Sequence, residues 1–169
     1  MSESIMVKQT KVFVGIDQSY HSTGLMVLDS EGSILRQENF SIVKGSKIEK
    51  VEECLVEFEK KIDFIPKIHN LQMVYIEGPA YSSSGSSTLQ MGALHYFLRL
   101  FLYKENIEFK VIAPTTLKKY IAGTGRAKKD LILLKVYKKW GVEFDISDLA
   151  DAYGLARMAL EEFTDGSNN

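Results

Sequence analysis

Acidic residues in this sequence are placed where they can do chemistry. Three of them, Asp145, Asp148 and Asp151, fall within the segment FDISDLADAYGLARMAL. Asp148 and Asp151 are three residues apart, so they share one face of the helix that this segment predicts. Like charges on one helix face lower stability, so a cation between them is one explanation. The other is structural: acids in a first turn favour the helix dipole, and Ser147 can cap the helix.

Two further acids end predicted strands. Asp17 follows KVFVGI, and Glu77 follows MVYI. A lone acid at the end of a strand usually only begins a loop. If the two strands are neighbours in the centre of a sheet, however, both carboxylates lie at one edge. Open α/β sheets place their ligand sites at that edge.

Four carboxylates would then meet at one end of the sheet. They are Asp17, Glu77, Asp148 and Asp151. Four ionised carboxylates cannot share a small volume without counter-charge. Ligands that are all oxygen select a hard cation, so we expect Mg²⁺, with Mn²⁺ able to substitute. Two such ions, about 3.5–4 Å apart, activate a water and stabilise the leaving oxygen in phosphodiester hydrolysis, so we expect two ions per site.

The elements that must position these acids follow the order βββαβαβααα. Predicted strands cover residues 11–17, 22–30, 32–43, 73–77 and 107–113. Predicted helices cover residues 46–66, 88–105, 114–121 and 127–140, and the helix with the aspartates closes the fold. A three-stranded meander followed by βαβ crossovers predicts an α/β fold. We expect a mixed five-stranded sheet, the meander plus parallel strands, with helices on both faces. Small residues on the last helix would let it approach the sheet closely.

Composition narrows the class of protein. With 169 residues and 45% hydrophobic residues, the chain predicts a single domain over residues 1–169, with a core at about 11–162 and short flexible termini. One cysteine, Cys54, excludes an internal disulfide framework, and three scattered histidines show no zinc-ligand spacing. Neither a signal peptide nor a membrane span is visible, so we expect a cytoplasmic protein.

Basic residues are concentrated in one part of the chain. The net charge is −1, but residues 104–140 hold ten Lys or Arg and three Asp or Glu. Such segregation allows one face of the protein to be basic. Most basic faces are simply solvent-exposed surface without a binding role. The acids make a nuclease plausible and therefore favour contacts with phosphate. The candidates for DNA contact are Lys118, Lys119, Arg126, Lys128 and Lys129.

Four segments, in order along the chain, match a known pattern: FVGIDQSYHSTGL, VYIEGPAY, IAPTTLKKYIAGTGRAKKD and SDLADAYGLA. Together they resemble the motifs of RuvC-like Holliday junction resolvases, which belong to the RNase H-like superfamily. The resemblance covers about residues 11–160. It implies an RNase H-like fold and a metal-dependent endonuclease that resolves branched DNA junctions in recombination. Asp17 and Glu77 match the strand acids of that family, and Asp148 and Asp151 match its paired helix acids.

The resemblance also implies contacts and an assembly. Lys118 and Lys129 match basic positions near the scissile phosphate, and Tyr81 is the candidate for an aromatic that wedges into the junction, or else a loop aromatic packed on the surface. Family members act as homodimers. The helix at 88–105 is apolar on more than one face, so one face either forms a dimer interface or is covered by the helix at 46–66. The short chain resembles the phage branch, which would place it in a bacterial host and leaves dependence on a branch-migration motor open.

Three other functions compete with this one. A related RNase H-fold nuclease would cut RNA–DNA hybrid or a replication fork. A non-catalytic module would bind junctions without cleavage, although the presence of all four acids argues against it. An actin-like phosphotransfer domain shares the meander but needs a second such domain, for which the chain is too short. We assign no role to Asp145 or His21.

Overall fold

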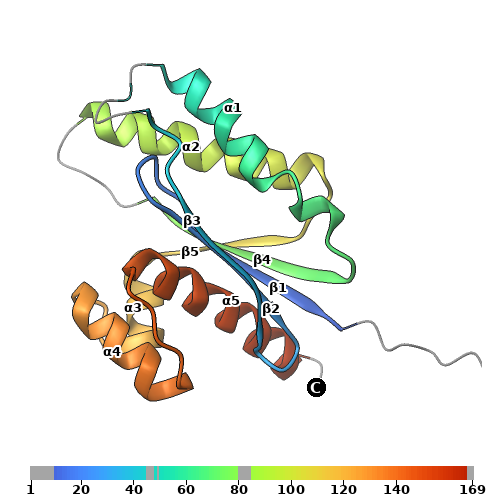
Figure 1. Ribbon diagram of the computed structural model, residues 1–169, viewed down its shortest axis with the longest axis vertical. Helices are drawn as coiled ribbons and strands as arrows, with labels where there is room; N and C mark the ends of the chain where they lie inside the picture. Colours follow the sequence, from blue (N-terminus) through green and yellow to red (C-terminus); the bar gives the residue numbers. More distant parts are fainter. Residues whose placement is uncertain (1–9, 45–47, 49, 80–84, 167–169) are drawn as a thin grey trace, which may run out of the picture.

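A five-stranded mixed sheet forms the centre of the protein in the computed structural model, which describes residues 10–44, 48, 50–79 and 85–166 (Figure 1). The strands are β1 (Val12–Asp17), β2 (Thr23–Asp29), β3 (Ile34–Phe40), β4 (Leu71–Glu77) and β5 (Phe109–Ile112). Their order in the sheet is β3-β2-β1-β4-β5. The first three pair antiparallel, and β4 and β5 continue the sheet parallel to β1. The predicted sheet is therefore confirmed, including the central position of β1 beside β4.

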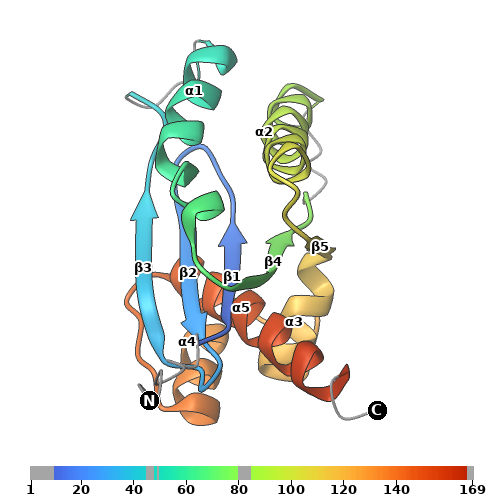
Figure 2. The same ribbon diagram turned by 90° about the vertical axis from the view of Figure 1, so that its right-hand side faces the viewer.

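Helices cover both faces of this sheet (Figures 1 and 2). On one face lie α1 (Val51–Ile62) and α2 (Gly85–Lys104), and on the other α3 (Pro114–Ala122), α4 (Lys129–Trp140) and α5 (Ser147–Gly166). Each face of the sheet buries its own apolar cluster, because alternate residues of a strand point to opposite faces. In β1, for example, Val14 belongs to the cluster under α1 and α2, and Phe13 belongs to the cluster under α5. None of the described helices is long and apolar enough to cross a membrane.

The predicted helix at 46–66 is the element that differs most from the structure. Lys50 has an extended backbone, and the helix α1 begins only at Val51. It ends at Ile62, and a separate 3-10 turn, η1 (Ile65–Lys67), follows it. Pro66 explains the early end, because proline has no N–H to donate and restricts the residue before it. Positions 46, 47 and 49 of the predicted helix lie outside the described residues.

The apolar face of α2 that the sequence left open is only partly covered by α1. Phe97 of α2 packs edge-on against Phe58 of α1, with ring centroids 6.4 Å apart. Leu94 and Leu98 are fully buried against the sheet. A further apolar stripe on α2 remains exposed in the monomer.

Two glycines let α5 lie directly on the sheet. A Cβ atom at Gly15 of β1 would be 2.0 Å from the carbonyl oxygen of Ala152, and one at Gly24 of β2 would be 2.1 Å from the carbonyl oxygen of Asp148. Any side chain at either position would force the helix away. The first two turns of α5 are therefore held against the ends of β1 and β2, where the acids of the last helix are needed.

Candidate active site

Asp17 and Glu77 meet at one edge of the sheet. They are the last residues of β1 and β4, which pair in parallel with Ile16 opposite Ile76. Parallel strands in register end at the same edge, so the two carboxyl groups leave the sheet side by side. They are hydrogen-bonded to each other. Two carboxyl groups can share such a bond only if one of them carries a proton.

The helix α5 brings the other two acids to the same edge. Asp151 interacts electrostatically with Asp17 and Asp148, and its charge also acts on Glu77. Its Oδ1 atom is buried and has no hydrogen-bond partner among the described residues. The structure thus brings together all four carboxylates that the sequence singled out.

Burial and mutual repulsion raise the pKa values of these acids. Burial is the largest cause for Asp17, whose pKa lies well above its ordinary value, and the charges of Glu77 and Asp148 add to it. Burial likewise raises the pKa of Glu77 to about 6, although its bond to Asp17 acts in the opposite direction. The pKa of Asp151 rises to about 7 through burial and the charges of Asp17 and Asp148. Ionising this group of acids is therefore unfavourable without a nearby positive charge.

Two lysines supply part of that positive charge. Lys129, the first residue of α4, places its Nζ 4.0 Å from Asp148 Oδ1 and lowers the pKa of Asp151. Lys118, half-buried on α3, lowers the pKa of both Glu77 and Asp151. These are the two lysines that the family resemblance placed near the scissile phosphate.

The remaining candidates for DNA contact are not among the charges that shift the pKa values of the acids, or lie outside the described residues. Lys119, Arg126 and Lys128 are exposed, and within the described residues only Lys118 and Lys129 act as cations on the raised pKa values. Tyr81 lies outside the described residues. Asp145 is exposed just before α5.

A hydrogen-bonded pair that sequence analysis missed contacts Asp148. The Ser22 hydroxyl, in the loop between β1 and β2, donates to Asp148 Oδ2, and the Asn39 amide of β3 donates to Ser22 Oγ at 3.0 Å. A serine in a loop and an asparagine on a strand are both common, so neither indicates a functional role from sequence alone. Only the pairing of β2 with β3, with Gly24 opposite Asn39, brings them together.

Buried polar side chains also tie the sheet edge to α2. The Gln18 amide, next to Asp17, donates to the backbone oxygen of Glu77 at 2.7 Å and to His95 Nδ1 at 3.1 Å. Burial lowers the pKa of His95, which favours the neutral ring that such an acceptor requires. The ends of β1 and β4 are thereby linked to each other and to the opposite helical layer.

The four carboxyl groups suit a hard divalent cation by their chemistry but are not arranged as its ligands. Among the described residues, no group of three or more His, Cys, Asp or Glu side chains is gathered closely enough to hold a metal ion. The donor set itself fits: every donor is an oxygen, and Asp151 offers a buried oxygen without a partner.

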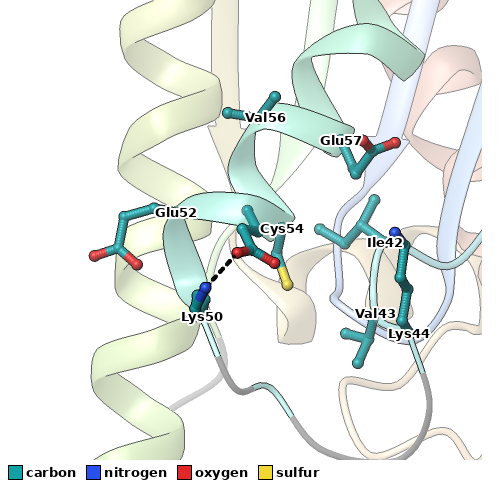
Figure 3. Close-up of a pocket in the computed structure, with 9 residues that line it drawn as sticks. Ile42, Val43, Lys44, Lys50, Glu52, Cys54, Val56 and Glu57 are labelled. Carbon is teal, nitrogen blue, oxygen red and sulfur yellow. Dashed lines mark hydrogen bonds and ion pairs between the residues drawn. The ribbon is translucent and has the colours of Figure 1, made fainter.

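A hollow elsewhere on the protein has no part in this chemistry. It measures about 520 Å³ and lies beside the start of α1, where Ile42, Cys54 and the Lys50–Glu53 ion pair line it (Figure 3). None of the four carboxylates lines it. The residues at positions 45–47 and 49, which border it in the chain, lie outside the described residues.

Comparison with protein families identifies close similarity to one of them. A family model described as crossover junction endodeoxyribonuclease RuvC matches residues 13–158. A protein of that name from Orientia tsutsugamushi is 30% identical over 151 residues, which cover 84% of this chain and 92% of the relative. Another, from a Sulfurovum species, is 28% identical over 154 residues, which cover 88% of this chain and 94% of the relative.

Solved structures share the fold. The structure of Thermus thermophilus RuvC matches with a TM-score of 0.71 and 22% identity, covering 91% of this chain and 96% of that one. The same protein in complex with a Holliday junction substrate matches with a TM-score of 0.72 and 21% identity, covering 92% and 96%. The yeast mitochondrial Holliday junction resolvase matches with a TM-score of 0.60 and 16% identity, covering 90% and 81%. The predicted RNase H-like fold class is confirmed.

Proposed function

The chain belongs to the family of the crossover junction endodeoxyribonuclease RuvC, and from this membership we propose that it resolves four-way DNA junctions by hydrolysing phosphodiester bonds. Related branched DNA junctions are included in the proposed substrate class. The observation that carries the proposal is the convergence of four carboxylates at the edge of the sheet, three of them with raised pKa values. A purely structural role for acids does not require so unfavourable a cluster.

We assign these carboxylates to a divalent-metal site, with Mg²⁺ as the ion, Mn²⁺ as a substitute, and two ions per site. Asp17, Glu77, Asp148 and Asp151 would hold the ions, which when bound activate a water and stabilise the leaving oxygen. The proton shared by Asp17 and Glu77 must leave before both can serve as ligands, because metal ligands are deprotonated.

The basic residues bind the DNA backbone in this proposal. Lys118 and Lys129 already interact with the carboxylates, so they are placed to contact the phosphate that is cut. Lys119, Arg126 and Lys128 contact phosphates farther along the same strand, since they lie on or beside the same two helices. Tyr81 retains its proposed role at the junction centre. Contacts to phosphate fix the position of the enzyme without reading sequence.

A homodimer through α2 completes the proposal. Four large apolar side chains along α2 are exposed in the monomer: Leu89 at 76%, Tyr96 at 64%, Leu100 at 51% and Tyr103 at 75%. Tyr96, Leu100 and Tyr103 are four and three residues apart, so they form one stripe on the helix. The stripe supports a second copy of this chain as its partner, because two-fold assembly presents the same surface from both subunits. Two active sites would then cut two strands of one junction.

A junction cleavage assay tests this function. A synthetic four-way junction, a linear duplex and an RNA–DNA hybrid are each incubated with the protein in Mg²⁺, Mn²⁺ or EDTA, and the products are resolved on a denaturing gel. We expect paired symmetric nicks in the junction alone, lost in EDTA and in Asp17→Asn. Cleavage of the hybrid instead would support the proposed metal site but show that the substrate is not a junction. Tight junction binding with no cleavage of any substrate would identify a binding module.

A further inference from the structure

A chain of hydrogen bonds runs across three elements to Asp148. Asn39 Nδ2, on β3, donates to Ser22 Oγ at 3.0 Å and to the backbone oxygen of Thr23 at 3.3 Å. The Ser22 hydroxyl in turn donates to Asp148 Oδ2, at the start of α5. Since Asn39 provides the donor, the single hydroxyl proton of Ser22 is free for the carboxylate.

The loop that carries Ser22 is held without its hydroxyl. Ser19 Oγ accepts from the Ser22 backbone N–H and donates to the Ser22 backbone oxygen, both at 2.9 Å. Thr23 Oγ1 donates to the Ser19 backbone oxygen at 2.7 Å and accepts from its N–H at 3.1 Å. Four bonds therefore fix the turn by backbone and by the side chains of Ser19 and Thr23. The Ser22 hydroxyl takes no part in these bonds and contacts Asn39 and Asp148 instead.

Asp148 needs such a contact more than Asp17 or Asp151. Its side chain is 20% exposed, and it lies in the first turn of α5, where a carboxylate can rotate toward water. Its two oxygens have different neighbours. Oδ2 accepts a hydrogen bond from Ser22, and Oδ1 accepts one from Ser147 Oγ at 3.2 Å and lies 4.0 Å from Lys129 Nζ. The bond from Ser22 holds one oxygen and so fixes the rotation of the carboxylate, with the other oxygen toward Ser147 and Lys129.

We propose that Ser22, held by Asn39, is a positioning residue that orients Asp148 as a ligand of the divalent-metal site. This inference rests on the proposed function of the same site. Ser22 holds one oxygen of Asp148 and thereby keeps the plane of the carboxylate turned so that its other oxygen faces Lys129. Partners that orient a metal ligand typically contribute 10–100-fold to metal affinity.

Metal affinity, measured without DNA, tests the inference. Calorimetric titration of Mn²⁺ into the full-length protein gives the dissociation constant for the unaltered chain, Ser22→Ala and Ser22→Thr. We expect Ser22→Ala to bind Mn²⁺ about 10-fold more weakly or worse, and Ser22→Thr, which keeps the hydroxyl, to stay within about 3-fold. Ser33→Ala is the matched control, because Ser33 is an exposed serine in the β2–β3 turn whose described bonds use its backbone.

A second variant and a second readout separate positioning from mere stability. Asn39→Ala leaves Ser22 in place but removes its anchor, so we expect a smaller loss of Mn²⁺ affinity, about 3-fold. A residue that only stabilises α5 would lower the melting temperature in EDTA and leave the Mn²⁺ constant unchanged. Equal Mn²⁺ affinity of Ser22→Ala and the unaltered chain overturns the inference, whatever the cleavage rate.

Failure of the proposed function gives a different result. If the unaltered chain binds no Mn²⁺ at millimolar concentration and cuts no junction, both proposals fall together. If it binds Mn²⁺ and cuts the junction, and Ser22→Ala does both equally well, only the positioning role falls. Junction binding in EDTA should be the same for Ser22→Ala and the unaltered chain, because Ser22 acts through Asp148.

Discussion

Asp17 and Glu77 end two directly paired parallel strands, and their carboxyl groups are hydrogen-bonded to each other. The raised pKa values of both groups mean that the pair holds a proton more readily than isolated carboxyl groups do. The protonation state of the pair is therefore linked to the affinity of the protein for a cation.

Without metal, the protein should lose stability as the pH rises from about 4 to about 7. The pKa values of Asp17, Glu77 and Asp151 are raised in the folded protein, Glu77 to about 6 and Asp151 to about 7. Over this range the folded state holds more protons than the unfolded state, so the free energy of unfolding falls with pH. We expect a loss on the order of 5 kcal/mol, or about 10–20 °C in melting temperature.

Thermal unfolding in EDTA at pH 5 and pH 8 measures this change. Mg²⁺ should restore the melting temperature at pH 8 and have little effect at pH 5, where protons compete for the carboxylates. Asp151→Asn should weaken the pH dependence, and Glu59→Gln, at an exposed position of α1, should leave it unchanged. A melting temperature that rises from pH 5 to pH 8 in EDTA would contradict the buried cluster of acids.

Conversion of any one proposed ligand to its amide should abolish cleavage. Asp17→Asn, Glu77→Gln, Asp148→Asn and Asp151→Asn each remove a charge that a divalent ion needs. We expect cleavage to fall more than about 100-fold, since loss of an outer partner alone costs 10–100-fold. Junction affinity in EDTA should stay within about 3-fold, measured by gel shift. Loss of junction binding in all four variants would show that these acids support the fold and not a metal site.

Lys118 and Lys119 offer a matched pair one residue apart. Lys118 lowers the pKa of Glu77 and Asp151, and Lys119 is exposed without such an effect among the described interactions. Lys118→Ala should therefore shift the pH midpoint of cleavage upward, because the acids then ionise less readily. Lys119→Ala should leave that midpoint in place. It should reduce by about one the slope of log binding constant against log salt concentration for junction binding. Equal pH midpoints for the two variants would argue against a role of Lys118 at the acids.

Gly24→Ala tests how closely α5 must lie on the sheet. The added Cβ would be 2.1 Å from the carbonyl oxygen of Asp148, which is backbone and cannot turn aside. We expect a loss of about 3 kcal/mol in stability, and loss of Mn²⁺ binding in whatever fraction stays folded. Gly166→Ala is the control, since a Cβ there meets nothing within 4 Å. Chemical denaturation compares the stability of the two variants. Normal Mn²⁺ binding by Gly24→Ala would show that α5 need not lie so close to the sheet.

Charge on the exposed stripe of α2 should dissociate the proposed dimer. Tyr96→Glu and Leu100→Glu place carboxylates on the exposed surface, so they should leave the fold of the monomer intact. We expect the unaltered chain to elute as a dimer in size-exclusion chromatography with light scattering, and both variants as monomers. The monomers should nick single strands but lose the pairing of the two cuts. Val56→Glu, at an exposed position of α1, should remain dimeric.

Much of the fold follows from local pattern, and the site follows from it only in part. Alternation and apolar runs predict the five strands, and the place of β1 beside β4 then puts Asp17 next to Glu77. The predicted ends of the helix α1 were wrong. The helical spacing of apolar residues continues beyond both ends of α1, but the extended backbone of Lys50 and the nearby Pro66 limit the helix.

The contacts that orient the site were not predictable from sequence. Gly15 and Gly24 carry no visible signal in a strand until a helix is known to lie on them. Ser22 and Asn39 meet only through the register of β2 and β3, and a shift of one residue would point Asn39 to the other face of the sheet. Spacing along the chain finds the acids, and tertiary packing alone decides what holds them.

The link from Gln18 to His95 gives the proposed dimer a fixed geometry. Gln18 joins the ends of β1 and β4 to His95, and His95 is followed on α2 by Tyr96, the exposed residue of the proposed interface. The proposed catalytic edge and the proposed subunit contact are therefore joined through a hydrogen-bonded, buried pair of side chains. In a dimer through α2, the protein would fix the distance between the two active sites. The bound junction would then have to change its shape so that both scissile phosphates fit this distance.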